Sequence, residues 1–169
     1  KGVEFKSETD TEVIPHLLDK YMKTGLDLEN ALRKVLDVIH GSYAIAAICV
    51  DEPDRVVATR KDSPLIVGIG HDEYFVASDY PAILKYARDI IFPEQGEIVV
   101  LNPDGVTVKD EYDNVINKEV TTINWSPEMA EKGGYDHFMI KEINEQDTAI
   151  QNTLTQRENV QQIVDELKG

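Results

Sequence analysis

The apolar residues of this chain change their spacing near residue 41, and this change limits the folds that the chain can adopt. Before it, they recur every three or four residues over 11–24 and 28–39, which is the spacing of one helix face. After it, short apolar runs alternate with turn residues, which predicts strands at 43–50, 55–60, 65–69, 74–77, 90–92, 97–101, 106–109 and 120–125. Helical spacing returns over 135–169, after a linker at 126–134 that is rich in helix breakers. This order predicts a layered α+β domain followed by the beginning of a second domain.

Local signals set the ends of several elements. Asp27 is expected to cap the second helix, and a short helix is predicted to start at Ser78. Asn102-Pro103-Asp104-Gly105 predicts a hairpin between two strands, and Asp51-Glu52-Pro53-Asp54 predicts a turn. The run 43–50 is apolar almost throughout, which predicts a strand that is buried on both faces.

The charge balance excludes two classes of partner. The chain has 17 basic and 32 acidic residues, so its formal net charge is −15. Binding to nucleic acid or to an anionic membrane needs a basic face, and we therefore expect neither partner. The acidity by itself favours solubility and does not indicate a function.

The single cysteine, Cys49, lies within an apolar run. Free cysteine usually behaves as a small buried hydrophobe, so we interpret Cys49 as a core residue and not as a nucleophile. One cysteine cannot form a disulfide within the chain, which fits a reducing compartment. The sequence contains no run long enough to span a bilayer and no signal peptide, and we expect a cytoplasmic location.

The sequence contains no pattern typical of a metal or cofactor site. The histidines, His16, His40, His71 and His137, are scattered without the spacing of metal ligands. Gly68-Ile69-Gly70 lacks the third glycine and the helix of a dinucleotide site, so we predict the end of a strand there. We expect no metal and no cofactor.

A dense group of polar residues precedes the first predicted helix. Ser7-Glu8-Thr9-Asp10-Thr11-Glu12 brings hydroxyls and carboxylates together. Ser, Thr and Asp side chains accept the first unpaired N–H groups of a helix, and the helix dipole favours acids there. Because one cap needs only one such residue, two interpretations stay open. The segment is a solvated cap with spare acids, or one of its carboxylates binds the ammonium group of a ligand.

Several sequence blocks occur in the order found in one enzyme family. Besides residues 7–12, they are Gly41-Ser42-Tyr43-Ala44, Ser63-Pro64-Leu65, Ala77-Ser78-Asp79, Glu131-Lys132-Gly133-Gly134-Tyr135 and His137-Phe138-Met139-Ile140-Lys141-Glu142-Ile143. With these blocks the chain resembles the glutamine–fructose-6-phosphate aminotransferases along nearly its whole length. The last block is specific, because it joins the glutaminase domain of that family to its sugar-isomerase domain. The chain departs from the family pattern at Asp136, Asn144 and Asp147, where a basic residue, histidine and proline are usual.

The resemblance implies a fold, an activity and a set of partners. The fold is the four-layer αββα type of N-terminal-nucleophile hydrolases (class II glutamine amidotransferases), here incomplete, with residues 1–125 in the glutaminase domain, 126–136 in the linker and 137–169 in the first isomerase helices. The family transfers the amide nitrogen of L-glutamine to fructose 6-phosphate, which gives glucosamine 6-phosphate and glutamate. Asp10 matches the aspartate with which the family binds the α-amino group of glutamine.

The resemblance also implies that the catalytic nucleophile is missing. The family uses a cysteine at its mature N-terminus, which would stand upstream of Lys1, and Cys49 lies at the wrong place in the pattern. We therefore expect no catalytic residue here and no activity from these residues alone. An absent segment would leave open sheet edges and an uncovered apolar face, which predicts a homo-oligomer or a partner chain.

Two other interpretations stay open. The chain could belong to another class II glutamine amidotransferase, such as a phosphoribosyl-transferring or an asparagine-forming enzyme. It could also be a non-catalytic interaction or regulatory module that has kept the fold and lost the chemistry.

Overall fold

The computed structural model of the chain describes residues 2–124 and 134–155. The chain divides into two compact units, Lys1–Asn124 and Trp125–Gly169. The predicted linker at 126–134 lies, apart from Gly134, outside the described residues, and so does the end of the last predicted helix. Among the described residues, no helix is both long and apolar enough to cross a membrane.

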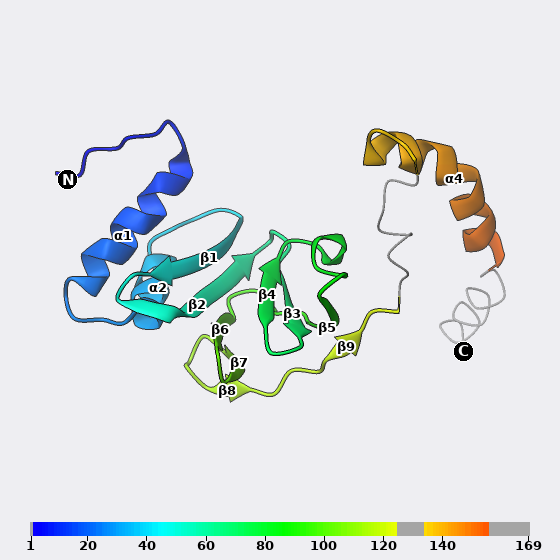
Figure 1. Cartoon of the computed structure of the whole chain (residues 1–169). Coiled ribbons are helices and arrows are strands. Elements are labelled where there is room, and N and C mark those ends of the chain that lie inside the picture. The colour runs from blue at the N-terminus through cyan, green and yellow to red at the C-terminus, as the bar shows by residue number, and fades with distance from the viewer. Residues whose placement is uncertain (1, 125–133, 156–169) are drawn as a thin grey trace, which may run out of the picture. The chain divides into compact units, whose positions relative to one another are not determined.

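Two helices form one layer of the first unit (Figure 1). The 3-10 turn η1 (Asp10–Glu12) leads into α1 (Val13–Met22), and α2 (Leu28–Leu36) follows. The prediction that Asp27 caps α2 is confirmed, because its Oδ1 accepts the backbone N–H of Asn30 at 2.9 Å. Both predicted helices are therefore present, although α2 ends earlier than the apolar spacing indicates.

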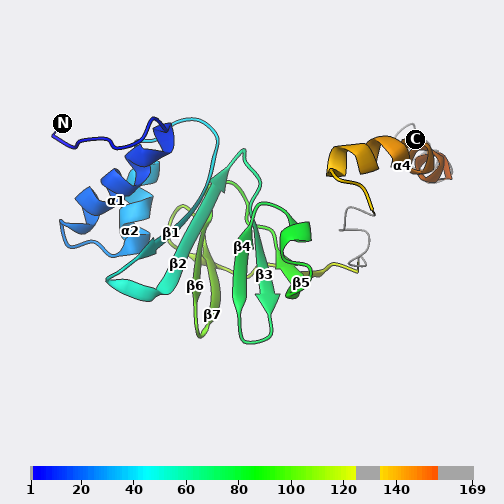
Figure 2. The same ribbon diagram turned by 45° about the horizontal axis from the view of Figure 1, so that its top comes forward.

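Two antiparallel sheets follow the helices (Figure 2). The first sheet has the strand order β1-β2-β6-β7-β8, with β1 at Tyr43–Cys49, β2 at Glu52–Lys61, β6 at Ile98–Asn102, β7 at Gly105–Lys109 and β8 at Val115–Ile116. The second sheet has the order β4-β3-β5-β9, with β3 at Ile66–Gly70, β4 at Tyr74–Ala77, β5 at Ala87–Ile91 and β9 at Thr121–Thr122. The second unit contains α4 (Phe138–Thr155).

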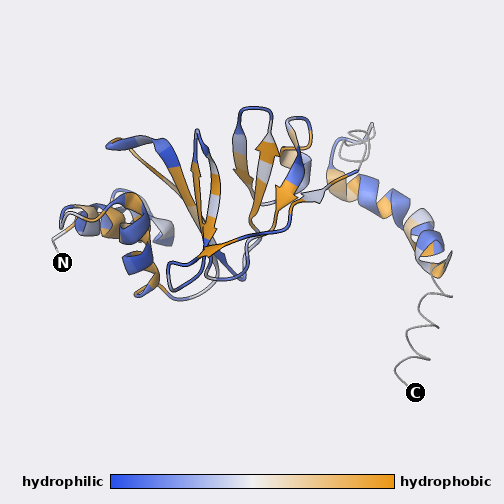
Figure 3. Ribbon diagram, turned by 90° about the horizontal axis from the view of Figure 1, so that it is seen from below, coloured by the Kyte–Doolittle hydropathy of each residue, from blue (hydrophilic) through white to orange (hydrophobic). Residues whose placement is uncertain are grey.

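Strand β6 shows how the layers are stacked. Ile98 and Val100 lie in the apolar cluster that the first sheet forms with α1 and α2, whereas Val99 and Leu101 lie in the cluster between the two sheets. Figure 3 shows the hydrophobic residues along the strands of both sheets. The first unit is therefore built from a helical layer, the first sheet and the second sheet, and the predicted α+β class is confirmed.

The segment after β4 covers the outer face of the second sheet. The apolar cluster on this face contains Ile66, Ile83 and Ile90. The short helix predicted to start at Ser78 is present only as the 3-10 helix η2 (Tyr80–Ala82), which Asp79 caps. Strand β5 already starts at Ala87, so the segment is too short for a longer α-helix.

Strand β1 is buried on one face only, so the prediction of burial on both faces is wrong for this strand. Ile45 and Ala47 are 8% exposed under the helices, whereas Ile48 on the other face is 78% exposed. The physical reason is position, since β1 lies at the end of the sheet order and the second sheet does not cover it. Both faces are buried in β6 instead, where residues 98–101 are all buried.

The hairpin between β6 and β7 is confirmed, whereas a second turn differs from its prediction. Asn102 Oδ1 accepts the backbone N–H groups of Asp104 at 2.9 Å and Gly105 at 3.1 Å, which fixes the hairpin. The turn predicted at 51–54 is shorter, because β2 begins at Glu52, which pairs with Cys49. Strand β8 is not among the predicted strands, because two residues are too few to show the alternation of apolar and polar side chains that is typical of a strand.

Gly68-Ile69-Gly70 lies at the end of β3, as predicted, and close packing explains its first glycine. A Cβ atom on Gly68 would lie 2.7 Å from Ile83 Cδ1 and 2.9 Å from Ala87 Cβ. Such distances are shorter than van der Waals contact, so the segment that covers the second sheet can approach β3 only over a glycine.

Candidate functional site

Asp10, the residue expected to bind a ligand, is the first residue of η1 and is exposed. The Thr11 hydroxyl donates a long hydrogen bond of 3.4 Å to Asp10 Oδ1. Among the described residues, no lysine, arginine or histidine forms an ion pair with Asp10. The carboxylate stands at the positive end of the helical segment, where the helix dipole favours a negative charge.

Glu12, and not Asp10, organises the chain before α1. Its Oε1 accepts the backbone N–H of Lys6 at 2.7 Å, and its Oε2 accepts the backbone N–H of Ser7 at 2.6 Å. The Ser7 hydroxyl also donates to Oε2, and His16 Nε2 lies 3.2 Å from Oε1. These hydrogen bonds, led by that of the Ser7 hydroxyl, lower the pKa of Glu12 to about 2.

The expectation that Ser, Thr or Asp side chains cap this helix start is wrong. Thr9 is the N-cap residue of η1, and its side chain accepts no capping hydrogen bond. The hydroxyls of Ser7 and Thr9 instead lie 2.9 Å apart, and Ser7 bonds to Glu12. None of these bonds uses the Asp10 carboxylate, so the turn forms without it.

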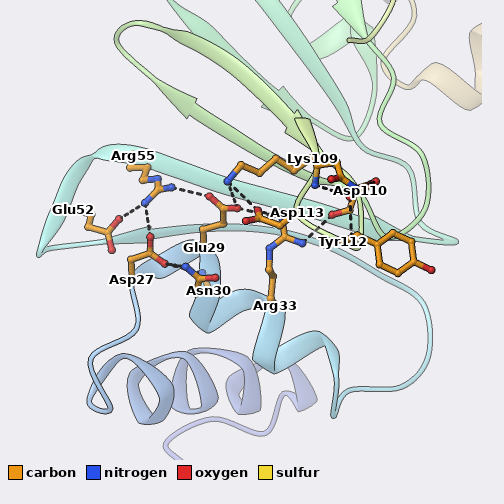
Figure 4. A network of polar contacts seen from close by, with 11 residues as sticks. Asp27, Glu29, Asn30, Arg33, Glu52, Arg55, Lys109, Asp110, Tyr112 and Asp113 are labelled. Carbon is orange, nitrogen blue, oxygen red and sulfur yellow. Dashed lines mark hydrogen bonds and ion pairs between the residues drawn. The ribbon is translucent and has the colours of Figure 1, made fainter. Parts of the chain in front are cut away.

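A cluster of charged side chains lies at the start of α2 (Figure 4). Glu29 stands at its centre, and its side chain is only 4% exposed. Its Oε1 accepts hydrogen bonds from Lys109 Nζ at 2.8 Å and from Arg33 at 3.2 Å, and its Oε2 accepts one from Arg55 at 2.8 Å. Because Arg55 belongs to β2 and Lys109 to β7, this carboxylate joins the helical layer to two strands of the first sheet.

Arg55 ties the same cluster to the first turn of α2. Its guanidinium pairs with Glu52 at 2.9 Å and with Asp27 at 3.2 Å. Glu52 in turn accepts the backbone N–H of Leu28 at 2.7 Å, which is one of the groups that a helix start leaves unpaired. Burial raises the pKa of Asp27, but the hydrogen bonds from Asn30 and Arg55 outweigh it, and the pKa is lowered.

Asp113 closes the cluster on its other side. Its Oδ1 lies 3.1 Å from both Lys109 and Arg33. The hydrogen bond from Lys109 lowers the pKa of Asp113, and the hydrogen bond to Glu29 raises the pKa of Lys109. Each of the cations Arg33, Arg55 and Lys109 thus has carboxylate partners. We interpret the cluster as a structural ion network and not as an acid–base site.

Sequence reasoning missed the roles of Glu12 and Glu29. Glu29 and Arg33 are four residues apart, a spacing that indicates an ion pair on a helix. The other cations that bind Glu29 are 26 and 80 residues away in the sequence, so no local pattern could find them. Cys49 is half-buried at the end of β1 and packs against the apolar cluster under the helices. In the described parts of the chain, no group of His, Cys, Asp or Glu side chains could hold a metal ion.

Comparison with known protein families shows to which family this chain belongs. The sequence profile described as "Glutamine amidotransferase domain" matches residues 1–85, which is half of the chain. This chain belongs to the glutamine amidotransferase family. The match covers the helical layer, β1 to β4 and η2, and it includes Asp10 and the Glu29 cluster as far as Arg55.

Curated relatives confirm the finer resemblance to glutamine–fructose-6-phosphate aminotransferases. The protein of that name from Methanothermobacter thermautotrophicus is 53% identical over 99% of this chain, and that from Clostridium perfringens is 57% identical over 93%. That from Thermococcus kodakarensis is 45% identical over 99%. The chain spans only 25–28% of the length of these relatives.

A solved structure confirms the fold of this amidotransferase chain. Glutamine phosphoribosylpyrophosphate amidotransferase from Bacillus subtilis matches it with a TM-score of 0.55 and 24% identity. The match covers 68% of this chain and 25% of that protein. The likeness supports the predicted N-terminal-nucleophile hydrolase type of fold, and at this identity it indicates the fold alone.

We predict that Ser7→Ala raises the pKa of Glu12 from about 2 towards its ordinary value of 4.5, because the strongest hydrogen bond to the carboxylate is lost. Since the folded pKa of Glu12 is lowered, its contribution to stability is present above pH 4.5 and is lost as the pH falls towards 2. The measurement is an NMR titration of the Glu12 side chain. Thr9→Ala is the matched control, because the Thr9 hydroxyl contacts the Ser7 hydroxyl and not the Glu12 carboxylate. An unchanged titration in Ser7→Ala would contradict the assignment.

We predict that Glu29→Gln lowers the free energy of unfolding of the chain by about 3 kcal/mol, because it leaves three part-buried cations without their shared buried carboxylate. Urea unfolding followed by circular dichroism measures this change. Asp19→Asn, which breaks the exposed pair with Lys23, is the control and is expected to cost less than about 1 kcal/mol. Equal losses in the free energy of unfolding would show that the network stabilises the chain no more than one exposed ion pair does.

Proposed function

We propose that this chain is part of an enzyme that transfers the amide nitrogen of L-glutamine to fructose 6-phosphate, giving glucosamine 6-phosphate and glutamate. The observation that supports this most is the identity of 45–57% with aminotransferases of that name, because it extends over 93–99% of the chain. Its fructose 6-phosphate site would lie in the rest of the enzyme, since the chain spans about a quarter of those relatives.

In this proposal the chain contains parts of two domains. Residues 1–125 belong to the glutaminase domain, 126–136 form the linker, and 137–169 are the first helices of the sugar-isomerase domain. The first described unit, which ends at Asn124, contains both sheets and the helical layer. The second contains α4, which starts at Phe138. A cytoplasmic location stays a prediction from the sequence.

Asp10 is the residue that we propose to bind the substrate. Its carboxylate is exposed. It takes no part in the hydrogen bonds by which Glu12 holds Lys6 and Ser7. It would accept hydrogen bonds from the α-ammonium group of glutamine, an interaction worth about 1.5–3 kcal/mol. The preceding turn is fixed by Glu12, so the Asp10 backbone is held in place before a ligand arrives. An amide without the charged group would lose this interaction and bind more weakly.

The proposed chemistry needs a nucleophile that these residues do not supply. Glutaminase action requires a thiolate or hydroxyl that attacks the side-chain amide and a base that takes its proton. The single cysteine, Cys49, is half-buried against the apolar cluster of the helical layer. Lys1 is not a nucleophile of this kind, so we propose that the cysteine comes from polypeptide outside these 169 residues.

We predict that the purified 169-residue chain releases no ammonia from glutamine. When the chain is fused behind the upstream amidotransferase segment of the Methanothermobacter thermautotrophicus relative, we expect glutaminase activity. In that fusion, Asp10→Asn is expected to raise KM for glutamine about ten- to hundredfold with little change in kcat, because ground-state binding is lost. Glu8→Gln, two residues away, is the control. Ammonia release by the chain alone that Asp10→Ala abolishes would overturn the proposal.

A second interpretation is an interaction or regulatory module without catalysis. It is favoured by β1, whose outer edge ends the first sheet and whose Ala44, Ala46 and Ile48 side chains are exposed. A free edge beside an apolar face is a surface on which another strand can pair. The encoded sequence upstream of Lys1 distinguishes the two interpretations. A Met-Cys start upstream supports the enzyme, whereas a start at Lys1 supports the module.

We predict that the chain self-associates through β1, or binds a partner chain that covers the exposed face of β1. Light scattering should show a mass above that of the monomer, and Ile48→Lys should reduce it by placing charge on the exposed face. Tyr112→Lys, on an exposed side chain outside the sheets, is the control. A monomer at high concentration would contradict the predicted homo-oligomer.

A further inference from the structure

The stretch of chain that carries Asp10 is closed into a turn by one side chain. Glu12 Oε1 accepts the backbone N–H of Lys6 at 2.7 Å, and its Oε2 accepts the backbone N–H of Ser7 at 2.6 Å. The Ser7 hydroxyl donates to the same Oε2. Asp10 lies in sequence between the two ends of this closure, and its own carboxylate is exposed. Glu12 therefore restrains the backbone on both sides of Asp10.

These contacts of Glu12 are shorter than most others within the turn. The Thr9 N–H donates to the Ser7 hydroxyl and the Glu12 N–H to the Thr9 carbonyl, each over 3.4 Å. The bond from Thr11 to Asp10 is equally long, and hydrogen bonds of this length are weak. The Ser7 and Thr9 hydroxyls are 2.9 Å apart, but this contact depends on Ser7, which Glu12 holds. The Glu12 side chain is only 14% exposed, so water competes little for its oxygens.

Glu12 is in turn fixed to α1. It is the N-cap residue of this helix, and Nε2 of His16, one helical turn further on, lies 3.2 Å from Glu12 Oε1. The ring of Phe5 meets the His16 ring edge-on, with 5.1 Å between the ring centroids. Leu18 of α1 belongs to the apolar cluster under the helices, and Leu17 packs against that cluster. A continuous series of contacts thus leads from the core through α1 and Glu12 to the turn that carries Asp10.

We propose that Glu12 is a positioning residue for glutamine, which holds the backbone of Asp10 in the conformation that binds the α-ammonium group. This inference rests on the proposed function of Asp10. Glu12 itself does not touch the ligand, because both of its oxygens already accept hydrogen bonds from the chain. A carboxylate on an ordered turn loses less conformational freedom when it binds, and this raises its affinity. Ground-state binding is the quantity affected, so KM for glutamine should depend on Glu12 and kcat should not.

The first measurement uses the 169-residue chain and needs no ligand. In Glu12→Gln an NH2 group replaces one acceptor oxygen, so at least one of the two backbone N–H groups loses its partner. We expect NMR relaxation to show the backbone order parameter of Asp10 falling from about 0.85 to below about 0.6. Asp19→Asn is the matched control, because it neutralises another carboxylate of α1 whose ion pair lies outside this turn. It should leave the order parameter of Asp10 unchanged.

The second measurement is the glutaminase activity of the fusion with the upstream segment. Glu12→Gln is expected to raise KM for glutamine about three- to tenfold and to change kcat less than about twofold, whereas Asp19→Asn should change neither. Ser7→Ala removes one donor and keeps both N–H bonds, so its increase in KM should be smaller. In the Asp10→Asn background, Glu12→Gln should have almost no further effect on KM, because it acts only through Asp10. A general loss of stability would not depend on Asp10 in this way.

The outcomes separate this inference from the proposed function. If Asp10→Asn raises KM and Glu12→Gln does not, or if Glu12→Gln acts equally with and without Asp10, the positioning role is overturned and Asp10 remains the ligand residue. An unchanged order parameter in Glu12→Gln overturns it as well. An unchanged KM in Asp10→Asn, or a fusion without activity, contradicts the proposed function instead. Circular dichroism establishes that each variant is folded, and Ser7→Ala supplies the test should Glu12→Gln not fold.

Discussion

The fold of the first unit depends on one strand that is buried on both faces. In β6, Ile98 and Val100 contact the helical layer while Val99 and Leu101 contact the second sheet, so this strand holds three layers together. Such a strand must be apolar at every position and must lie inside its sheet, with hydrogen-bonded neighbours on both edges. The β6–β7 hairpin and the pairing of β6 with β2 meet this requirement. The helices and the second sheet follow because each has an apolar face to bury against it.

Two carboxylates at helix starts make different kinds of contact in this fold. Glu12 bonds to backbone N–H groups before α1 and fixes a local turn, whereas Glu29 at the start of α2 binds cations from β2 and β7. Glu29 thereby adds a directional contact to apolar packing, which has none, and it sets how α2 lies over the first sheet. Asp10 takes part in neither arrangement. A ligand at Asp10, as we propose, would therefore not disturb the hydrogen bonds of Glu12 or the ion pairs of Glu29.

The exposed apolar surfaces of the chain differ in what they can accept. The free edge and the Ile48 face of β1 offer backbone hydrogen bonds and apolar area without any charge, so they suit a strand of many sequences. The exposed side of α4 offers apolar side chains interrupted by Asp147. An amidotransferase chain that spans a quarter of its relatives has surfaces of both kinds. The physical distinction is between pairing by backbone, which is promiscuous, and pairing by side chain, which is selective.

The sequence by itself determined the elements that depend on near neighbours. The spacing of apolar residues predicted α1, α2 and the principal strands, Asp27 predicted its cap, and Asn102 to Gly105 predicted a hairpin, because each signal is contained in a few consecutive residues. The resemblance of whole blocks indicated the family and pointed to Asp10. Tertiary structure alone decided which apolar strand lies inside the sheet, so β1 and β6 look alike in sequence and differ in burial. It also decided that Glu29 meets Arg55 and Lys109, because contacts across such long separations follow from the stacking of layers and leave no local pattern.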